Sequence, residues 1–355
     1  MKMKAAILYG PRDLRVEEIE APVTGENGVL IRIRVCGICP SDVRYYSGDK
    51  RDATYPWRPG HEWVGEVLEA GPEVERFQPG DRVAAFFQVV CGMCRNCQRG
   101  LFNLCLTRWG PDGDERLPSI KRGGFAEIGW AVSDALEHIP DNLSWDEASF
   151  TEPLACCYNG IKRTPISAGD TVAIVGVGPI GQLLAQLARL RGARVIALDL
   201  DPERLALAKQ LGVSETIVAS EPNAVQQVLD LTHGYGADAV IVAVGSPQAE
   251  KSALEMVCQG GCVSFFAGTY PSTTIPVDPN LIHYKQLWVT GSFHYGPGDF
   301  RTALDLLSGG QVQVTPLVSH RLPLDEIVEG FEIVANRRGR KALIHCSGEV
   351  WRAAP

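Results

Sequence analysis

The spacing of hydrophobic positions along this chain changes near Thr164. Before that point, short apolar or alternating runs are separated by dense Pro and Gly, which is typical of strands and turns. Examples are residues 28–39 (GVLIRIRVCGIC), 63–71 (WVGEVLEAG) and 81–90 (DRVAAFFQVV). No helical pattern of useful length is found before about Trp145. We therefore expect the first part of the chain to be mostly β.

After Thr164, apolar strands alternate with amphipathic helices. Strands are predicted at 171–175, 194–200, 237–245 and 261–268, and helices at 181–192 and 202–212. Strands that alternate with helices of about 10–15 residues predict a parallel, doubly wound sheet. Beyond Ser292 the pattern is mixed again, with predicted helices at 300–310 and 323–339 and a last strand at 341–346.

A glycine-rich turn follows the first strand of this parallel region. The sequence GVGPIG opens the next helix, which is the context that gives a G-x-G-x-x-G motif its meaning. Its glycines permit a tight turn, close approach of the backbone to a pyrophosphate, and close packing of helix on strand. The residues that we expect at a dinucleotide are Gly176, Gly178, Pro179, Ile180 and Gly181.

The end of the second strand indicates which dinucleotide is bound. Asp199 can accept hydrogen bonds from the adenosine ribose, and its charge repels a 2′-phosphate. Asp201 precedes a proline and is expected to cap the following helix instead. Arg204 lies nearby, where its positive charge would offset part of that repulsion. The sequence predicts NAD rather than NADP.

Four cysteines lie close together in the segment CGMCRNCQRGLFNLC. Cys91, Cys94, Cys97 and Cys105 have a spacing that can direct four thiolates at one tetrahedral ion, as in closed structural zinc sites. Unrelated thiols or a disulfide pair would not need such regular spacing. An iron–sulfur cluster remains an alternative at this point.

A second, mixed group of possible ligands is spread along the chain. Cys39 ends a predicted strand, His61 and Glu62 follow Gly60, and Glu152 precedes the nucleotide-binding region. One thiolate, one imidazole and carboxylates can hold a catalytic zinc with a position left for water or substrate. Each residue alone is more often structural, but the combination with the four cysteines and the glycine-rich turn favours a metal.

These motifs, in this order, resemble the zinc-dependent medium-chain alcohol and polyol dehydrogenases. The resemblance covers essentially the whole chain and includes CGICPSD, GHEWVGEV, the four cysteines, TEPL, GVGPIG and VTPLVSHRLPLDEIVEGFE. It implies an α/β protein in which a Rossmann domain (156–292) is flanked by a mostly-β, partly barrel-like (GroES-like) catalytic domain. The two ends of the chain (1–155 and 293–355) would form that catalytic domain, with a structural zinc lobe at about 91–105 and the active site in the cleft between the domains.

The sorbitol-dehydrogenase-like branch resembles this chain best, because Glu152 stands where classical relatives have a cysteine ligand. The resemblance implies hydride transfer between NAD and a secondary alcohol of a polyol, sugar alcohol or cyclitol. Cys39 and His61 would be fixed zinc ligands, while Glu62 and Glu152 could exchange roles. The alternatives are a threonine, amino-alcohol or simple-alcohol dehydrogenase of the same family, or a non-catalytic NAD-binding sensor.

The resemblance also implies roles around the reacting alcohol. Ser41 would accept the hydroxyl proton, and Asp42 would orient His61. Arg44 stands where a histidine often completes the proton relay. Tyr45 and Phe87 are candidates to line the substrate pocket.

Composition sets the remaining expectations. The chain has 355 residues, 45% of them hydrophobic, and a net charge of −8, which disfavours nucleic acid and acidic membrane surfaces as partners. No apolar run is long enough to span a membrane, and no signal pattern opens the chain. Eleven cysteines suit a reducing cytoplasm. We expect a cytoplasmic homodimer or homotetramer with two Zn²⁺ and NAD per chain, acting on a small molecule.

Overall fold

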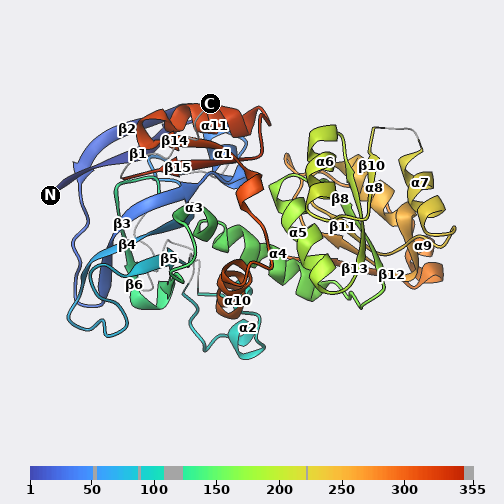
Figure 1. Ribbon diagram of the computed structural model, residues 1–355, viewed down its shortest axis with the longest axis horizontal. Helices are drawn as coiled ribbons and strands as arrows, with labels where there is room; N and C mark the ends of the chain where they lie inside the picture. Colours follow the sequence, from blue (N-terminus) through green and yellow to red (C-terminus); the bar gives the residue numbers. More distant parts are fainter. Residues whose placement is uncertain (51–53, 87–88, 108–122, 221–222, 348–355) are drawn as a thin grey trace. The chain divides into compact units, whose positions relative to one another are not determined.

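A computed structural model describes residues 1–50, 54–86, 89–107, 123–220 and 223–347 (Figure 1). The chain divides into two compact units. The first unit comprises Met1–Pro153, Gly296–Gly310 and Val314–Pro355, and the second comprises Leu154–Tyr295 with Gln311–Gln313. Phe87 lies outside the described residues. Among those described, no helix combines the length and apolar character that a membrane crossing requires.

The second unit is built on a six-stranded sheet in which every pairing is parallel. Its strands are β8 (Thr171–Val175), β9 (Arg194–Asp199), β10 (Glu215–Val218), β11 (Ala237–Val242), β12 (Val257–Phe265) and β13 (Trp288–Gly291). The order β10-β9-β8-β11-β12-β13 places the switch point between β8 and β11, where doubly wound sheets bind dinucleotides. The predicted parallel sheet is confirmed.

Helices connect these strands, and their starts follow the sequence closely. They are α5 (Pro179–Leu190), α6 (Pro202–Gln210), α7 (Ala224–Leu231), α8 (Pro247–Met256) and α9 (Pro279–Lys285). Asp201 caps α6 by accepting a hydrogen bond from the Glu203 amide at 2.9 Å, as its position before a proline predicts. The strands bury almost continuous apolar runs, such as Val172–Val175, because helices pack against the sheet.

The first unit is mostly β. One sheet has the order β14-β15-β3-β4-β5-β7, with β6 paired to β3, and a separate hairpin pairs β1 with β2. The strands are β1 (Lys2–Gly10), β2 (Asp13–Glu20), β3 (Gly28–Gly37), β4 (Glu62–Ala70), β5 (Arg82–Ala85), β6 (Ile128–Val132), β7 (Leu136–His138), β14 (Val318–Pro323) and β15 (Lys341–His345). Because β15 pairs with β3, the C-terminal segment completes a sheet begun near the N-terminus.

Short helices accompany this sheet. They are α1 (Pro40–Ser47), α2 (Arg95–Gln98), α3 (Trp145–Ala148), α10 (Pro297–Ser308) and α11 (Ile327–Ala335), with 3₁₀ turns η1 (Phe102–Leu104), η2 (Ser133–Ala135), η3 (Thr315–Leu317) and η4 (Leu324–Glu326). Helix α4 (Thr151–Arg163) begins in the first unit and continues in the second.

The expectation of no helix before Trp145 is wrong at α1. This helix starts at Pro40, directly after Cys39, and ends at Gly48 in the left-handed conformation with φ 80°. Among its apolar residues only Val43 and Tyr46 are buried, three positions apart. Two buried apolar positions are too few for a recognisable helical period. Cys39 therefore stands at a helix start, two residues beyond the end of β3.

Candidate metal centres and cofactor site

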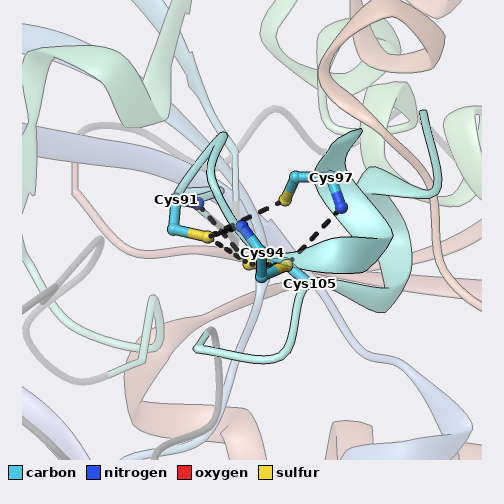
Figure 2. Close-up of side chains that lie close together, drawn as sticks. All are labelled: Cys91, Cys94, Cys97 and Cys105. Atoms are coloured by element: carbon cyan, nitrogen blue, oxygen red, sulfur yellow. Dashed lines mark hydrogen bonds between the residues drawn. The ribbon is translucent and has the colours of Figure 1, made fainter. Parts of the chain in front are cut away.

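The four cysteines of segment 91–105 converge on one point (Figure 2). Sulfur–sulfur distances are 3.6 Å for Cys91–Cys105, 3.9 Å for Cys91–Cys97 and 4.0 Å for Cys94–Cys105. Four sulfurs held about 2.3 Å from a tetrahedral zinc lie about 3.8 Å apart. All four cysteines are free thiols, so a disulfide pair is excluded. The short distances leave room for a single ion rather than a multi-iron cluster. We call this group the four-cysteine lobe.

Local backbone geometry prepares these sulfurs for a cation. The amides of Cys94 and Leu106 donate to sulfurs of the lobe at 3.3 and 3.4 Å, and such bonds favour thiolates. A hydrogen bond with Thr107, followed by backbone amides, lowers the pKa of Cys91 to about 6. Burial, reinforced by neighbouring sulfurs, raises the pKa of Cys97 to about 12. Thiolates held this close together repel one another. A bound cation would relieve that repulsion, so the four sulfur donors fit zinc.

Three residues of the predicted mixed group also lie together in the first unit. Ligand atoms of Cys39, His61 and Glu62 are all within 4.8 Å of one another. Cys39 is placed by the start of α1, and His61 and Glu62 by the start of β4. Gly60 makes the approach possible, because its φ of 100° suits glycine and a side chain there would lie 2.9 Å from Phe125. We call these three residues, with Glu152, the mixed site.

Asp42 contacts the histidine of the mixed site. Its Oδ1 lies 3.4 Å from His61 Nδ1 and accepts a hydrogen bond from the Gly60 amide, also at 3.4 Å. A carboxylate at Nδ1 directs Nε2 toward a metal, as in carboxylate–histidine–zinc arrangements. Burial of His61 opposes its charged form, but Asp42 and the Cys39 sulfur outweigh it, and the pKa of His61 is raised well above its usual value. The protein groups alone thus favour a positive charge at this point.

Glu152 lies on the first turn of α4 and is buried, but its carboxylate is not within the tight group of three. The sequence analysis did not identify Lys341, whose charge interacts with both glutamates. Lys341, the first residue of β15, contacts Glu62 Oε2 through its ammonium group. Burial lowers the pKa of Lys341, but Glu62, Cys39 and Glu152 together raise it above its usual value. A lysine that opens an otherwise apolar strand is the one signal that could have indicated this role.

The glycine-rich turn connects β8 to α5 as predicted. Gly176 has φ 87°, and a side chain on Gly181 would overlap the carbonyl oxygen of Gly176, so both positions require glycine. Gly178 precedes the first turn of α5, which contains Pro179 and Ile180. Backbone amides at this helix start can bind a phosphate group.

Asp199 ends β9 beside this turn. Its carboxylate accepts two hydrogen bonds from backbone amides. The Val177 amide donates to Oδ2 at 2.7 Å, and the Asp201 amide donates to Oδ1 at 3.0 Å. Arg204 Nη1 lies 3.9 Å from Asp199 Oδ1, so the arginine and the aspartate share the same end of the strand. An anion and a cation therefore lie together where an adenosine ribose is expected.

Two further predicted residues lie on α1. Ser41 occupies its second position and is half-buried, and Tyr45 lies one turn further on. The Tyr45 ring is 4.7 Å from the Trp57 ring, and Lys50 Nζ lies 5.3 Å from its centroid. Tyr45 thus belongs to a half-buried aromatic pair whose two residues lie between Cys39 and His61 in the sequence.

Comparisons with known protein families cover most of the chain. Residues 25–141 match the model of the alcohol dehydrogenase GroES-like domain, and residues 179–309 match the zinc-binding dehydrogenase model. These ranges correspond to the mostly-β region with both metal-ligand clusters and to most of the parallel sheet.

Individual relatives extend over nearly the full length. A sorbitol dehydrogenase from Halalkalibacterium halodurans is 33% identical over 97% of this chain and 99% of its own. An erythritol/L-threitol dehydrogenase from Mycolicibacterium smegmatis is 33% identical over 94% and 95%. Among solved structures, one described as a zinc-binding dehydrogenase from Sinorhizobium meliloti 1021, bound to NADP, superposes with a TM-score of 0.87 at 32% identity, covering 97% of this chain and 99% of that chain.

Proposed function

Because the chain belongs to the family of zinc-dependent alcohol dehydrogenases, we propose that it oxidises a secondary alcohol of a polyol, sugar alcohol or cyclitol with NAD. The observation that carries this proposal is the meeting of Cys39, His61 and Glu62. The buried Glu152 stands where classical relatives would have a cysteine as the third ligand. The carbinol C–H would leave as hydride to the nicotinamide, and the hydroxyl proton would leave to solvent, which yields a ketone and NADH.

The chain's own residues would divide the work. Zinc, when bound in the mixed site, would supply a positive charge that lowers the pKa of the alcohol hydroxyl. Cys39 and His61 would hold it, and Asp42 would keep His61 in the correct orientation. Ser41 Oγ would accept the hydroxyl proton and pass it outward. A second zinc would occupy the four-cysteine lobe and stabilise that segment.

A substrate panel with metal analysis tests this function. Purified protein should contain two zinc ions per chain and form NADH, measured at 340 nm, with polyols or cyclitols. Ser41→Ala should lower kcat by about 10²–10⁴-fold, typical of a lost proton-transfer group, while NAD affinity stays unchanged. Ser47→Ala, on the same helix, is the matched control. Turnover of L-threonine or of unbranched primary alcohols alone would contradict the polyol assignment.

For the cofactor we propose a preference for NAD over NADP. The support is Asp199, whose carboxylate is held by two backbone amides at the end of β9 and would repel a 2′-phosphate. A test is needed because one similar solved structure is bound to NADP, and the positive charge of Arg204 would attract a 2′-phosphate. Asp199→Ala should lower the ratio of kcat/KM with NAD to kcat/KM with NADP, and Arg204→Ala should raise that ratio. A higher kcat/KM with NADP in the wild-type protein would reverse the assignment.

We further propose a homodimer or homotetramer that pairs through β13. This strand forms one edge of the parallel sheet, and Trp288 is 68% exposed on it, with Tyr284 of α9 at 77%. Exposed apolar side chains on an open strand edge favour pairing with another strand. Trp288→Glu should lower the mass measured by light scattering. An unchanged mass, with Val277→Glu as the exposed control, would place the interface elsewhere.

The cytoplasm is the proposed location of this enzyme. All eleven cysteines are free thiols in the structure, and both clusters of metal ligands need reduced cysteine. Fractionation of the producing cells, followed by immunodetection, tests this proposal.

A further inference from the structure

Glu250 is a buried carboxylate of the parallel-sheet unit that the proposed chemistry does not use. It lies on the first turn of α8 and is 9% exposed. Its Oε1 accepts a hydrogen bond from the hydroxyl group of Thr269, four residues beyond the end of β12. Glutamate is rarely buried without a partner, because removing its charge from water is costly. The pair is therefore a specific link between α8 and the loop that follows β12.

The link lies beyond the carboxyl ends of β11 and β12, which pair in parallel. The Phe266 and Ala267 amides both donate to the Val242 carbonyl oxygen, at 3.0 and 3.1 Å, so the chain leaves both strands at the same place. The two loops come close at Gly245, where any side chain would lie 2.5 Å from the Gly268 carbonyl oxygen. The loops that follow β11 and β12 therefore touch through their backbones, and the glutamate–threonine link joins them a second time.

The loop that follows β11 also lies against the glycine-rich turn. A side chain on Gly176 would be only 3.0 Å from Val244 Cβ. A doubly wound sheet binds the two halves of a dinucleotide on opposite sides of its switch point, at the carboxyl ends of the strands. Asp199 at the end of β9 marks the adenosine side, which leaves the carboxyl ends of β11 and β12 for the nicotinamide side. Both linked loops thus border the position expected for the nicotinamide.

We propose that Glu250 is a positioning residue for the nicotinamide half of the cofactor and acts through the Thr269 hydroxyl group. The inference rests on the proposed function, because it assigns NAD to this sheet. Gly268 gives the loop after β12 many backbone conformations, and the link selects one of them. Without the link, NADH would have to bind the small fraction of molecules in the competent conformation, which weakens its apparent affinity. The adenosine half would bind as before, because its expected contacts lie at β8 and β9.

A comparison of NADH with ADP-ribose isolates the nicotinamide half, because ADP-ribose lacks the nicotinamide ring. Calorimetry on the zinc-loaded protein measures both affinities. Thr269→Val removes the hydroxyl group at nearly constant volume and should weaken NADH binding by about 10-fold, but ADP-ribose binding by less than about 2-fold. Thr269→Ser keeps the hydroxyl group and should restore NADH affinity. Thr273→Val, exposed in the same segment, is the matched control.

The same measurement tests the glutamate. Glu250→Met should reproduce the selective loss of NADH affinity, whereas Glu250→Gln, whose amide oxygen can still accept the hydrogen bond, should stay within about 3-fold of the wild-type protein. The double variant Glu250→Met/Thr269→Val should bind NADH no more weakly than either single variant, because all three lack the same hydrogen bond. Glu255→Met, at an exposed position of α8, is the control.

Two results would overturn the inference. One is an equal loss of NADH and ADP-ribose affinity, which a merely structural link would produce. The other is unchanged NADH affinity in Thr269→Val protein that is folded by circular dichroism. Both leave the dehydrogenase assignment intact, because the wild-type protein still binds NADH and turns over. Failure of the wild-type protein to bind NADH would overturn the NAD proposal and this inference together.

Discussion

The four-cysteine lobe and the mixed site are two candidate zinc sites built in opposite ways. The lobe takes all its sulfurs from one short segment, residues 91–105, and the start of α2 sets part of their geometry. The mixed site takes one residue from the start of α1, Glu62 from β4, His61 from the position just before it, one residue from α4 and its buried cation from β15. The first is a local structure, whereas the second exists only when the sheet is complete.

This difference in construction suits the two roles. A closed set of four thiolates satisfies its ion fully and stabilises a segment that has little other regular structure. A mixed set with a buried lysine is more costly to assemble, but it can leave a position open for a substrate. We therefore expect damage to the lobe to appear as lost stability, and damage to the mixed site as lost chemistry.

Cys39→Ser should have the largest effect on activity. Loss of the thiolate should remove one of the two zinc ions, and turnover should fall to background, while the melting temperature measured by circular dichroism changes little. Cys258→Ser, a half-buried thiol far along the chain in β12, is the control and should keep both metals. A Cys39→Ser protein with full zinc content would disprove the role of this residue.

Cys94→Ser should have the opposite profile. One zinc ion should again be lost, but now the melting temperature should fall clearly, because metal binding at such a site contributes directly to folding. The folded fraction should retain kcat within about a factor of ten. Met93→Ser alters the neighbouring side chain, 79% exposed, and should leave metal content and stability unchanged. If both cysteine variants lost activity equally at full folding, the division of roles would be wrong.

The two sites also differ in how far sequence could predict them. Regular spacing predicted the lobe, since its ligands are close in the chain. The ligands of the mixed site were predicted from their residue types together with the two other motifs, and their individual roles from the resemblance to a family. The comparisons confirm the family, and the ligand roles stay predictions. Lys341 was missed because it lies 279 positions from Glu62, and only the pairing of β15 with β3 and of β3 with β4 brings them together.

The fold shows the same contrast between local and distant order. The parallel sheet was predicted because each of its strands and helices has its own hydrophobic period, as in β8 and α5. Helix α1 was missed because it is short, although it positions both Ser41 and Asp42. The pairing of β15 with β3, and of β14 with β15, could not be derived from periodicity, because strand patterns do not specify which strands pair.

Asp42→Asn should have an intermediate effect confined to the mixed site. An amide in place of the carboxylate that faces His61 Nδ1 would no longer orient the imidazole through its charge. Metal affinity or kcat/KM should fall by about 10–100-fold, as is usual for groups that support metal ligands. Asp49→Asn, exposed just beyond the same helix, is the control. An unchanged zinc affinity would show that His61 is oriented by other contacts.

Asp146→Asn should have the smallest effect and should separate acid sensitivity of the fold from loss of metal. Asp146 contacts Arg321 Nε at 2.6 Å and His345 Nε2 at 3.2 Å, which link α3 to β14 and β15 without any metal. Burial acts to raise the pKa of Asp146, but its interactions with His345 and Arg321 outweigh it, and the pKa is lowered. A carboxylate with a lowered folded-state pKa adds stability above its unfolded value, about 3.9, and loses that contribution as the pH falls through the folded pKa.

Chelator-treated protein isolates this contribution, because both metal sites would otherwise also release their ions in acid. At pH 7 the melting temperature of Asp146→Asn should be about 2–4 °C below that of the wild-type protein, the shift expected for roughly 1 kcal/mol in a unit of this size. The difference should shrink as the pH falls below about 4, where the wild-type carboxylate becomes protonated. Asp134→Asn, outside this cluster, should show no such convergence. A gap between Asp146→Asn and wild type that stays constant into acid would mean that the ion pairs do not contribute, and that acid lability in this unit comes from its metal ligands alone.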